Sequence, residues 1–225
     1  MKIIFVRHAN PDYELDRLTK LGRIQAEAVS TVLCEMGIER VYSSSNNRAL
    51  ETADFTAKKL SLDVVKCDFI REINWGMKDS NLPYNQGDPW SLARKYLQNG
   101  LALNDENWKT SLEFSKTNTP ESVEKLAKGL DEWLCSLGFE RDGFYYRVKK
   151  PVYKTVAIFC HAGAFAGATS HLFNLPYPFT LLTFPFDQTG ISIVEIGGKE
   201  GDLAVPTLRC LGNVDHLKNS GIEIT

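Results

Sequence analysis

Short, continuous apolar blocks alternate with longer amphipathic segments along most of the chain. The blocks at residues 3–6 and 155–160 are uninterrupted and rich in β-branched residues, which is typical of strands covered on both faces. Weaker blocks of the same kind predict four more strands. These lie at 41–42, 62–67, 190–196 and 207–211.

Helical periodicity fills most of the intervals between these strands. We expect the first helix to begin after Thr19 and end at Gly37, with one stripe of apolar residues facing the core. That stripe consists of Leu21, Ile24, Ala28, Val32 and Met36. Further helices are predicted at 47–60, 89–98, 120–137 and 162–173. The alternation predicts an α/β fold, a three-layer α/β/α arrangement with a mostly parallel, doubly wound central sheet.

The stretch from Trp75 to Asn118 departs from this pattern, because its apolar spacing is looser and it contains several Gly and Pro residues. We expect one domain over residues 1–225, with a helical insertion at about 75–118 that caps one end of the sheet. The insertion would contact the substrate. Candidate contacts are Trp90, Arg94 and Trp108.

The composition excludes several classes of protein. Lys and Arg number 26 against 28 Asp and Glu, so the formal net charge is −2, which argues against a nucleic-acid partner. Hydrophobic residues make up 43% and charged residues 24%, as in globular rather than disordered chains. No apolar run approaches the roughly 20 residues that a membrane span needs.

The five cysteines are scattered and form no C-x-x-C pair, so neither a zinc site nor a disulfide framework is predicted. Reduced thiols are typical of cytosolic proteins, and we therefore expect a cytoplasmic location. Oligomeric state is not readable from the sequence. The cysteines are Cys34, Cys67, Cys135, Cys160 and Cys210.

Two predicted strands end in histidine at the sheet edge where open α/β sheets bind ligands. Arg7-His8 follows the first strand, and His161 follows the strand at 155–160. Because the carboxyl ends of parallel strands share one edge, the two histidines can converge on one site. The cation Arg7 at this edge calls for an anionic ligand. A Rossmann or P-loop nucleotide site is excluded, since neither glycine motif follows any predicted strand.

Five short motifs combine these residues with others of distinctive chemistry. They are Arg7-His8-Ala9, Leu18-Thr19-x-x-Gly22-x-x-Gln25-Ala26, Ser44-x-x-x-Arg48-Ala49-x-x-Thr52-Ala53, Arg71-Glu72-x-x-x-Gly76 and His161-Ala162-Gly163. In this order, the set resembles the histidine phosphatase superfamily, the phosphoglycerate-mutase-like proteins. The matching pieces span residues 1–76 and 155–196, whereas the insertion between them matches no motif of that family.

The resemblance implies a metal-independent phosphatase without a cofactor, which hydrolyses a small phosphate monoester through a phosphohistidine. It implies that His8 is the nucleophile, that Glu72 protonates the leaving oxygen and then activates water, and that His161 donates a hydrogen bond to the phosphate. Arg7 and Arg48 would bind the phosphate, because the planar guanidinium fork matches its oxygens. A covalent route suits this chemistry, since it divides a very slow reaction into two easier steps.

The sequence departs from the family pattern in several places, one of which favours a hydrolase over a mutase. Ala9 replaces the usual glycine, and Glu14 stands where many members carry an asparagine, so we expect Glu14 to point away from the phosphate. The segment 75–79 lacks the Trp-Glu-Gly that often follows the acid, which argues against phosphoglycerate mutase activity. The alternatives are a cofactor-dependent mutase and a phosphate-binding module without turnover. Substrate identity depends on the unmatched insertion.

Several single residues have structural interpretations as well. Arg48 has the alternative of a solvated helix position, and Glu72 that of a surface ion pair with Arg71. His171 and His216 are predicted to be structural.

Overall fold

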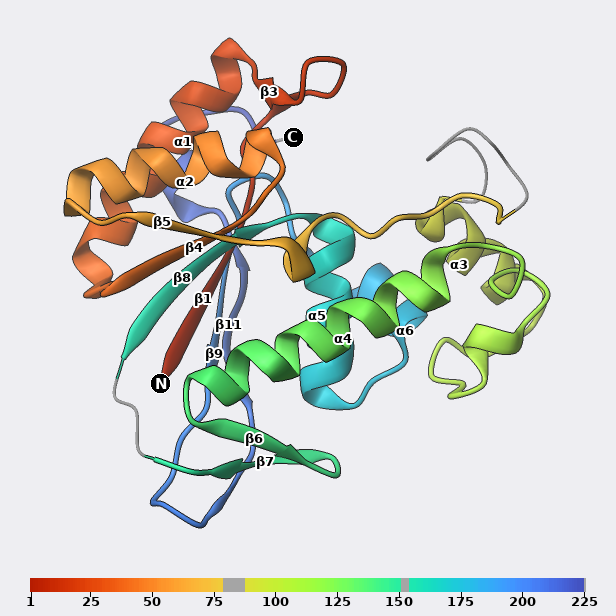
Figure 1. Cartoon of the computed structure of the whole chain (residues 1–225). Helices are drawn as coiled ribbons and strands as arrows, with labels where there is room; N and C mark the ends of the chain where they lie inside the picture. Colours follow the sequence, from red (N-terminus) through yellow and green to blue (C-terminus); the bar gives the residue numbers. More distant parts are fainter. Residues whose placement is uncertain (79–87, 151–153, 225) are drawn as a thin grey trace.

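The centre of the molecule is a six-stranded sheet (Figure 1). The computed structural model describes residues 1–78, 88–150 and 154–224. Strands β1, β8, β4 and β5 run parallel, and β9 and β11 are antiparallel to their neighbours, which confirms the predicted mostly parallel sheet. In spatial order the strands are β11 (Thr207–Asn213), β9 (Ile191–Glu195), β1 (Lys2–Arg7), β8 (Thr155–Cys160), β4 (Arg40–Ser44) and β5 (Val64–Cys67).

Helices cover both faces of this sheet and complete the three layers. Figure 1 shows α1 and α2 on one face and α4 and α5 on the other, with α6 beside α5. The helices are α1 (Lys20–Leu33), α2 (Asn47–Leu60), α3 (Pro89–Gln98), α4 (Thr119–Ser136), α5 (Ala162–Phe173), α6 (Tyr177–Thr183) and α7 (Asp215–Lys218).

Smaller elements lie around this frame. A two-stranded sheet carries the segment after His8, and a three-stranded one packs near the end of α4. The remaining elements are β2 (Pro11–Asp12), β3 (Arg17–Leu18), β6 (Phe139–Asp142), β7 (Tyr145–Val148), β10 (Leu203–Ala204) and the 3₁₀ helices η1 (Cys34–Met36), η2 (Asp68–Ile70) and η3 (Trp108–Thr110).

The central strand β1 is buried on both faces, and its alternate residues face different helix layers. Ile4 and Val6 pack in one hydrophobic cluster with residues of α1 and α2. Ile3 and Phe5 pack in the other cluster, with residues of α4 and α5. This follows from the two-residue period of a strand, and it explains why the sequence block is continuously apolar.

Helices α2, α3 and α5 begin and end where the periodicity predicts, but the buried stripe predicted for α1 is wrong. Ile24 is 54% exposed, whereas Gly22, Ala26 and Val29 are buried. The reason is a close backbone approach, because a Cβ at position 22 would lie 2.1 Å from the carbonyl oxygen of Asn10. The helix therefore turns its small residues toward the loop that follows β1.

The predicted insertion contains α3, and its residues 79–87 lie outside the described residues. The prediction that Trp108 contacts substrate is wrong, since Trp108 is 3% exposed and packs in the core. Its ring centroid lies 5.2 Å from that of Phe114 and 5.5 Å from that of Tyr177. Arg94 is exposed on α3.

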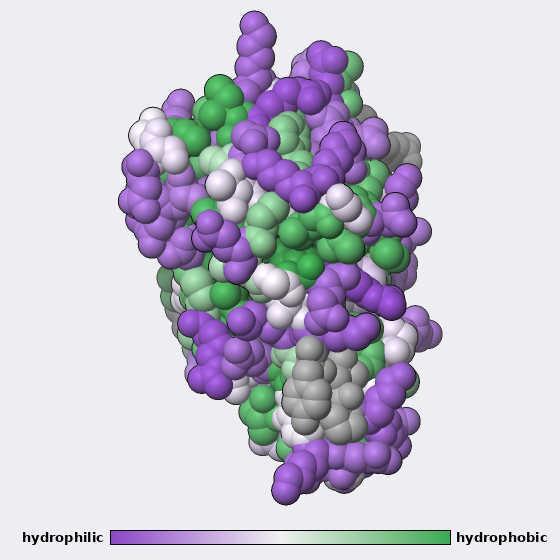
Figure 2. Space-filling view, turned by 90° about the vertical axis from the view of Figure 1, so that its left-hand side faces the viewer, coloured by the Kyte–Doolittle hydropathy of each residue, from purple (hydrophilic) through white to green (hydrophobic). Residues whose placement is uncertain are grey.

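Hydrophilic residues cover most of the face drawn in Figure 2, with hydrophobic residues in smaller patches between them. None of the helices in the described ranges has the length and apolar character needed to cross a lipid bilayer.

Candidate active site

The two predicted histidines meet at one edge of the sheet. Strands β1 and β8 pair in parallel, with Arg7 opposite Cys160, so the residues that follow them are neighbours. The backbone N–H of His8 donates to the carbonyl of Cys160 at 2.9 Å, which extends the pairing by one residue. The ring centroids of His8 and His161 lie 5.1 Å apart, and both side chains are buried.

The segment after His8 is held by side chains of the two neighbouring helices. The N–H of Ala9 donates to Thr52 Oγ1 at 3.0 Å, and the N–H of Asn10 donates to Gln25 Oε1 at 2.8 Å. Thr19 Oγ1 donates to Asn10 Oδ1 at 2.6 Å. The polar residues of the motifs at 18–26 and 44–53 therefore position the backbone that follows His8.

The His8 ring presents one nitrogen for chemistry. Nδ1 lies 2.8 Å from the carbonyl oxygen of Ala9, and because a carbonyl only accepts, this bond assigns the proton to Nδ1. Burial, together with the charges of Arg7 and Arg48, lowers the pKa of His8 well below 6.5. Near pH 7 the ring is therefore neutral, and Nε2 carries the lone pair.

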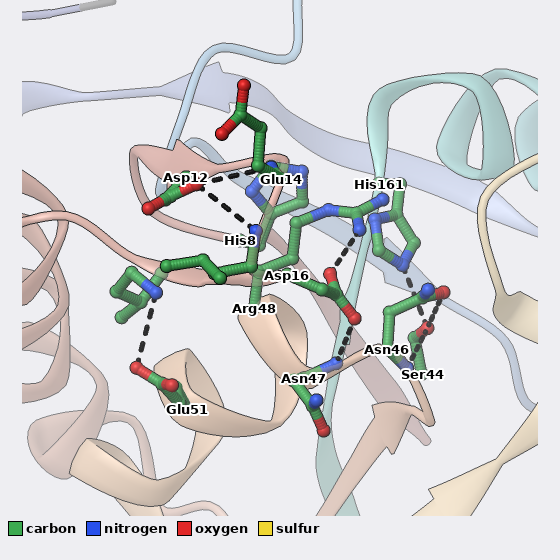
Figure 3. A network of polar contacts seen from close by, with 12 residues as sticks. His8, Asp12, Glu14, Asp16, Ser44, Asn46, Asn47, Arg48, Glu51 and His161 are labelled. Atoms are coloured by element: carbon green, nitrogen blue, oxygen red, sulfur yellow. Dashed lines mark hydrogen bonds and ion pairs between the residues drawn. The ribbon is translucent and has the colours of Figure 1, made fainter. Parts of the chain in front are cut away.

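Arg7 and Arg48 flank the histidines and keep donor groups unused. Nη1 of Arg7 donates to the carbonyl of Phe186 at 2.9 Å, and Nη1 of Arg48 forms an ion pair with Asp16. Figure 3 shows the Arg48 guanidinium directed toward His161. The Nε atoms of both arginines are buried and have no partner within the described residues. An oxyanion entering here would satisfy donors that are otherwise costly to leave unpaired.

His161 is linked to the end of β4. Its Nε2 lies 2.8 Å from Ser44 Oγ, and Ser44 Oγ donates to Asn46 Oδ1 at 3.2 Å, which makes Nε2 the donor toward Ser44. Nδ1 is buried without a partner within the described residues. Burial, followed by the charges of His8, Arg48, Arg7 and Arg71, lowers the pKa of His161 well below 6.5. A bound anion opposes these effects and favours protonation at Nδ1.

Glu72 lies at the N-terminus of α5. Its Oε1 accepts the backbone N–H groups of Ile73 at 2.9 Å and Ala164 at 3.0 Å. Burial raises the pKa of Glu72 above 4.5, and this outweighs the lowering by the two hydrogen bonds and by Arg48 and Arg7. The alternative of a surface ion pair between Glu72 and Arg71 is wrong: among the described residues, the partners of the Glu72 carboxylate are backbone N–H groups.

A cavity of about 850 Å³ adjoins this site, and His8 and His161 are not among the residues that line it. Arg7, Arg48 and Glu72 line one part of it. Trp90, from the predicted insertion, lines another part, and Arg94 does not line it. Within the described ranges no three His, Cys, Asp or Glu side chains gather so as to hold a metal ion.

Sequence reasoning missed two residues of this arrangement. Asp16 contacts Arg48 and the N–H of Asn47 from a loop whose polar sequence carries no distinguishing signal. Tyr13 places its ring 5.5 Å from the guanidinium carbon of Arg48. Glu14 is exposed, and in Figure 3 its carboxylate points away from Arg48, as expected.

The chain matches the model of the histidine phosphatase superfamily (branch 1) over residues 3–207. It is 23% identical over 218 residues to "Putative phosphoserine phosphatase 2" of Hydrogenobacter thermophilus, covering 93% of this chain and 96% of that protein. It is also 39% identical over 80 residues to mitochondrial serine/threonine-protein phosphatase Pgam5 of Drosophila sechellia. That match covers 31% of this chain and only 28% of the Drosophila protein.

Among solved structures, a phosphoserine phosphatase mutant of Entamoeba histolytica in complex with phosphoserine has a TM-score of 0.65 to this chain. The two are 20% identical, and the match covers 96% of this chain and 98% of the other. This likeness extends the shared fold over nearly the whole molecule.

Proposed function

The chain belongs to the histidine phosphatase superfamily, and we propose that it hydrolyses phosphate monoesters through a phosphohistidine formed on His8. One observation carries the proposal. His8 is held in a single tautomer with Nε2 free, between two arginines whose buried Nε–H groups have no partner within the described residues. This is the environment that a nucleophile toward a phosphate dianion needs.

In the first half-reaction, His8 Nε2 forms a bond to phosphorus while the bond from phosphorus to the ester oxygen breaks. Arg7 and Arg48 donate to the phosphoryl oxygens, where charge is spread in the transition state. Glu72, with its raised pKa, donates its proton to the leaving oxygen and so releases the alcohol.

In the second half-reaction, water attacks the phosphorus and the bond from His8 Nε2 to phosphorus breaks. The Glu72 carboxylate accepts a proton from the water, which restores its acid form for the next cycle. Inorganic phosphate leaves, and the net reaction is ester plus water giving alcohol plus phosphate. The positive charges of Arg7 and Arg48 stabilise the phosphoryl group throughout, and the bound phosphate favours the protonated form of His161, which then donates to it.

The expected partner is a small phosphorylated molecule, and the net charge of −2 weighs against a nucleic acid. We also propose a cytoplasmic location. All five cysteines are free thiols, and this supports a reducing compartment. Cell fractionation with an antibody to the chain tests the location.

The experiment that tests the function incubates purified protein with a radiolabelled phosphate monoester and quenches it briefly. We expect acid-labile, base-stable label on the protein, and the label and turnover should both fall by about 10³-fold or more in His8→Ala. The matched control is His171→Ala, because His171 pairs with Asp131 outside the cavity.

The outcomes separate the alternatives. Release of inorganic phosphate supports a hydrolase, and transfer of the label to a second alcohol identifies a mutase. Binding of phosphate without label or turnover identifies a binding module. Full activity in His8→Ala overturns the assignment of the nucleophile.

A further inference from the structure

The part of the cavity beyond the phosphate-binding groups differs sharply from them in chemistry. Residues at and just after the end of α6 form one wall, and two tryptophans form another. The tryptophan rings meet edge to face, with 5.8 Å between their centroids. The apolar residues of this part are Trp75, Trp90, Leu181, Leu182, Phe184 and Phe186.

All of these side chains except Trp75 are held in place by the core. Phe186 stacks on Phe165 with ring centroids 3.9 Å apart, and Leu181 is 6% exposed. Trp90, Leu182 and Phe184 are partly buried and pack against the main hydrophobic cluster. A rigid apolar wall of this kind gains free energy mainly by removing apolar ligand surface from water.

Charge is distributed unevenly over the cavity. Among the described residues that line it, Arg7 and Arg48 are the only cations, and the proposed mechanism uses both for the phosphate. Arg71 does not line the cavity. The segments 79–87 and 151–153, outside the described part, contain neither Lys nor Arg in their sequence. Asp187 adds a carboxyl group to the lining of the cavity.

A leaving group that carries a carboxylate would find no described cation in the cavity besides the two arginines, and Asp187 would add repulsion. An uncharged aromatic or bulky apolar group would instead bury its surface against the tryptophans and leucines. The volume of about 850 Å³ lies within the range of pockets that enclose ligands considerably larger than phosphate.

We propose that the substrates are phosphate monoesters with an uncharged aromatic or bulky apolar leaving group, and that carboxylated esters such as phosphoserine are poor substrates. This inference rests on the proposed hydrolase function. It sets this chain apart from the Entamoeba histolytica relative, whose structure is a complex with phosphoserine.

The test compares three esters whose leaving oxygens are all primary alkoxides. They are ethyl phosphate, benzyl phosphate and 4-carboxybenzyl phosphate. We expect kcat/KM for benzyl phosphate to exceed that for ethyl phosphate by about 100-fold, because of the buried ring. Adding the carboxylate should lower kcat/KM by about 10- to 100-fold. Equal or faster hydrolysis of 4-carboxybenzyl phosphate overturns the inference.

Variants of the apolar wall test whether it is the origin of the preference for benzyl phosphate. Leu182→Ala and Trp90→Ala should each lower kcat/KM for benzyl phosphate by about 10-fold while that for ethyl phosphate stays within about 2-fold. Leu97→Ala is the matched control, since Leu97 lies on α3 with Trp90 but is 51% exposed and outside the cavity. Asp187→Asn should raise kcat/KM for 4-carboxybenzyl phosphate by about 10-fold. Unchanged benzyl preference in both wall variants contradicts the inference.

A binding measurement separates this inference from the proposed function. Calorimetry with benzylphosphonate and 4-carboxybenzylphosphonate, which cannot be hydrolysed, should give tighter binding of the uncharged compound by about 10-fold or more. If no ester is hydrolysed but this order holds, the hydrolase proposal fails and the ligand class stands. If esters are hydrolysed and the order is reversed, only the ligand class fails.

Discussion

The carboxylate of Asp16 forms an ion pair with the guanidinium of Arg48, and its second oxygen accepts the N–H of Asn47 at 2.9 Å. One side chain thereby binds both the first turn of α2 and the arginine that this turn presents to the site. Arg48 keeps its Nε–H unpaired within the described residues. Asp16 therefore orients Arg48 while leaving a donor for the phosphate.

Replacing Asp16 tests this positioning role. Asp16 has a φ of 46°, in the left-handed region that Asn tolerates and Ala disfavours. We expect Asp16→Ala to raise KM by about 10-fold, because Arg48 loses its orientation, and to change kcat less. Asp16→Asn keeps a hydrogen bond and should stay within about 3-fold of the wild type. Glu14→Ala, in the same loop, should have no effect; equal KM values in all three variants would contradict the role.

Glu72→Gln should affect esters according to their leaving group. An alkoxide leaves poorly without a proton, whereas nitrophenolate is stable without one. We expect hydrolysis of benzyl phosphate to fall by about 10²–10⁴-fold and that of 4-nitrophenyl phosphate to fall far less. Rates of His8 phosphorylation measured by rapid quench check this. Equal losses for both esters, in a folded variant, would assign the proton to another group, with His161 the next candidate.

The pH profile should reflect two groups with oppositely shifted pKa values. His8 attacks only when neutral, so activity should be lost as pH falls through its pKa, which burial places well below 6.5. Glu72 donates only when protonated, so activity should be lost as pH rises through its pKa, which burial places above 4.5. A bell-shaped profile of kcat/KM for benzyl phosphate follows. With 4-nitrophenyl phosphate, which needs no acid, the basic limb should weaken; an unchanged limb would exclude Glu72 as its origin.

The position of the Glu72 carboxylate requires glycine at residue 163, for a steric reason. A Cβ at this position would lie 2.7 Å from Oε1 of Glu72 and would displace the carboxylate. We expect Gly163→Ala to lower kcat/KM for benzyl phosphate by about 10- to 100-fold. Gly167→Ala on the same helix is the control, because its Cβ would meet Leu126 at an ordinary 3.5 Å. That variant should keep full activity and gain up to about 1 kcal/mol of stability.

Activity should survive metal removal. Arg7 and Arg48 already supply positive charge to the phosphate, so the mechanism needs no metal ion as an electrophile. Dialysis against EDTA should leave kcat/KM for benzyl phosphate unchanged. Loss of activity that a divalent ion restores would indicate a different phosphatase mechanism.

Much of the fold was predictable because its signals are local. The strands β1 and β8 are continuous apolar blocks, and the bounds of α2, α3 and α5 follow from side-chain periodicity and from their first residues. The order of motifs also predicted that His8, His161, Arg7, Arg48 and Glu72 belong together. Their catalytic roles stay predictions that the experiments above test.

Other features were decided only when distant segments packed. The face that α1 buries depends on the approach of Gly22 to Asn10, which periodicity within the helix does not contain. Trp108 is buried in the core because its ring packs against those of Phe114 and Tyr177. From the sequence alone, an aromatic residue in an insertion of loose apolar spacing is equally consistent with contact to a ligand.

The sequence alone therefore determined the six strands of the central sheet, most helices and the family to which the reactive residues point, since these depend on neighbours along the chain. The short strands β2, β3, β6, β7 and β10 were not predicted. The tertiary structure decided which of those residues share a cavity, how far burial shifts the pKa values of His8 and Glu72, and that Asp16 holds Arg48. The physical reason is that desolvation and charge–charge interaction depend on distances in space. Residues 32 positions apart, such as Asp16 and Arg48, acquire such a distance only when the chain folds.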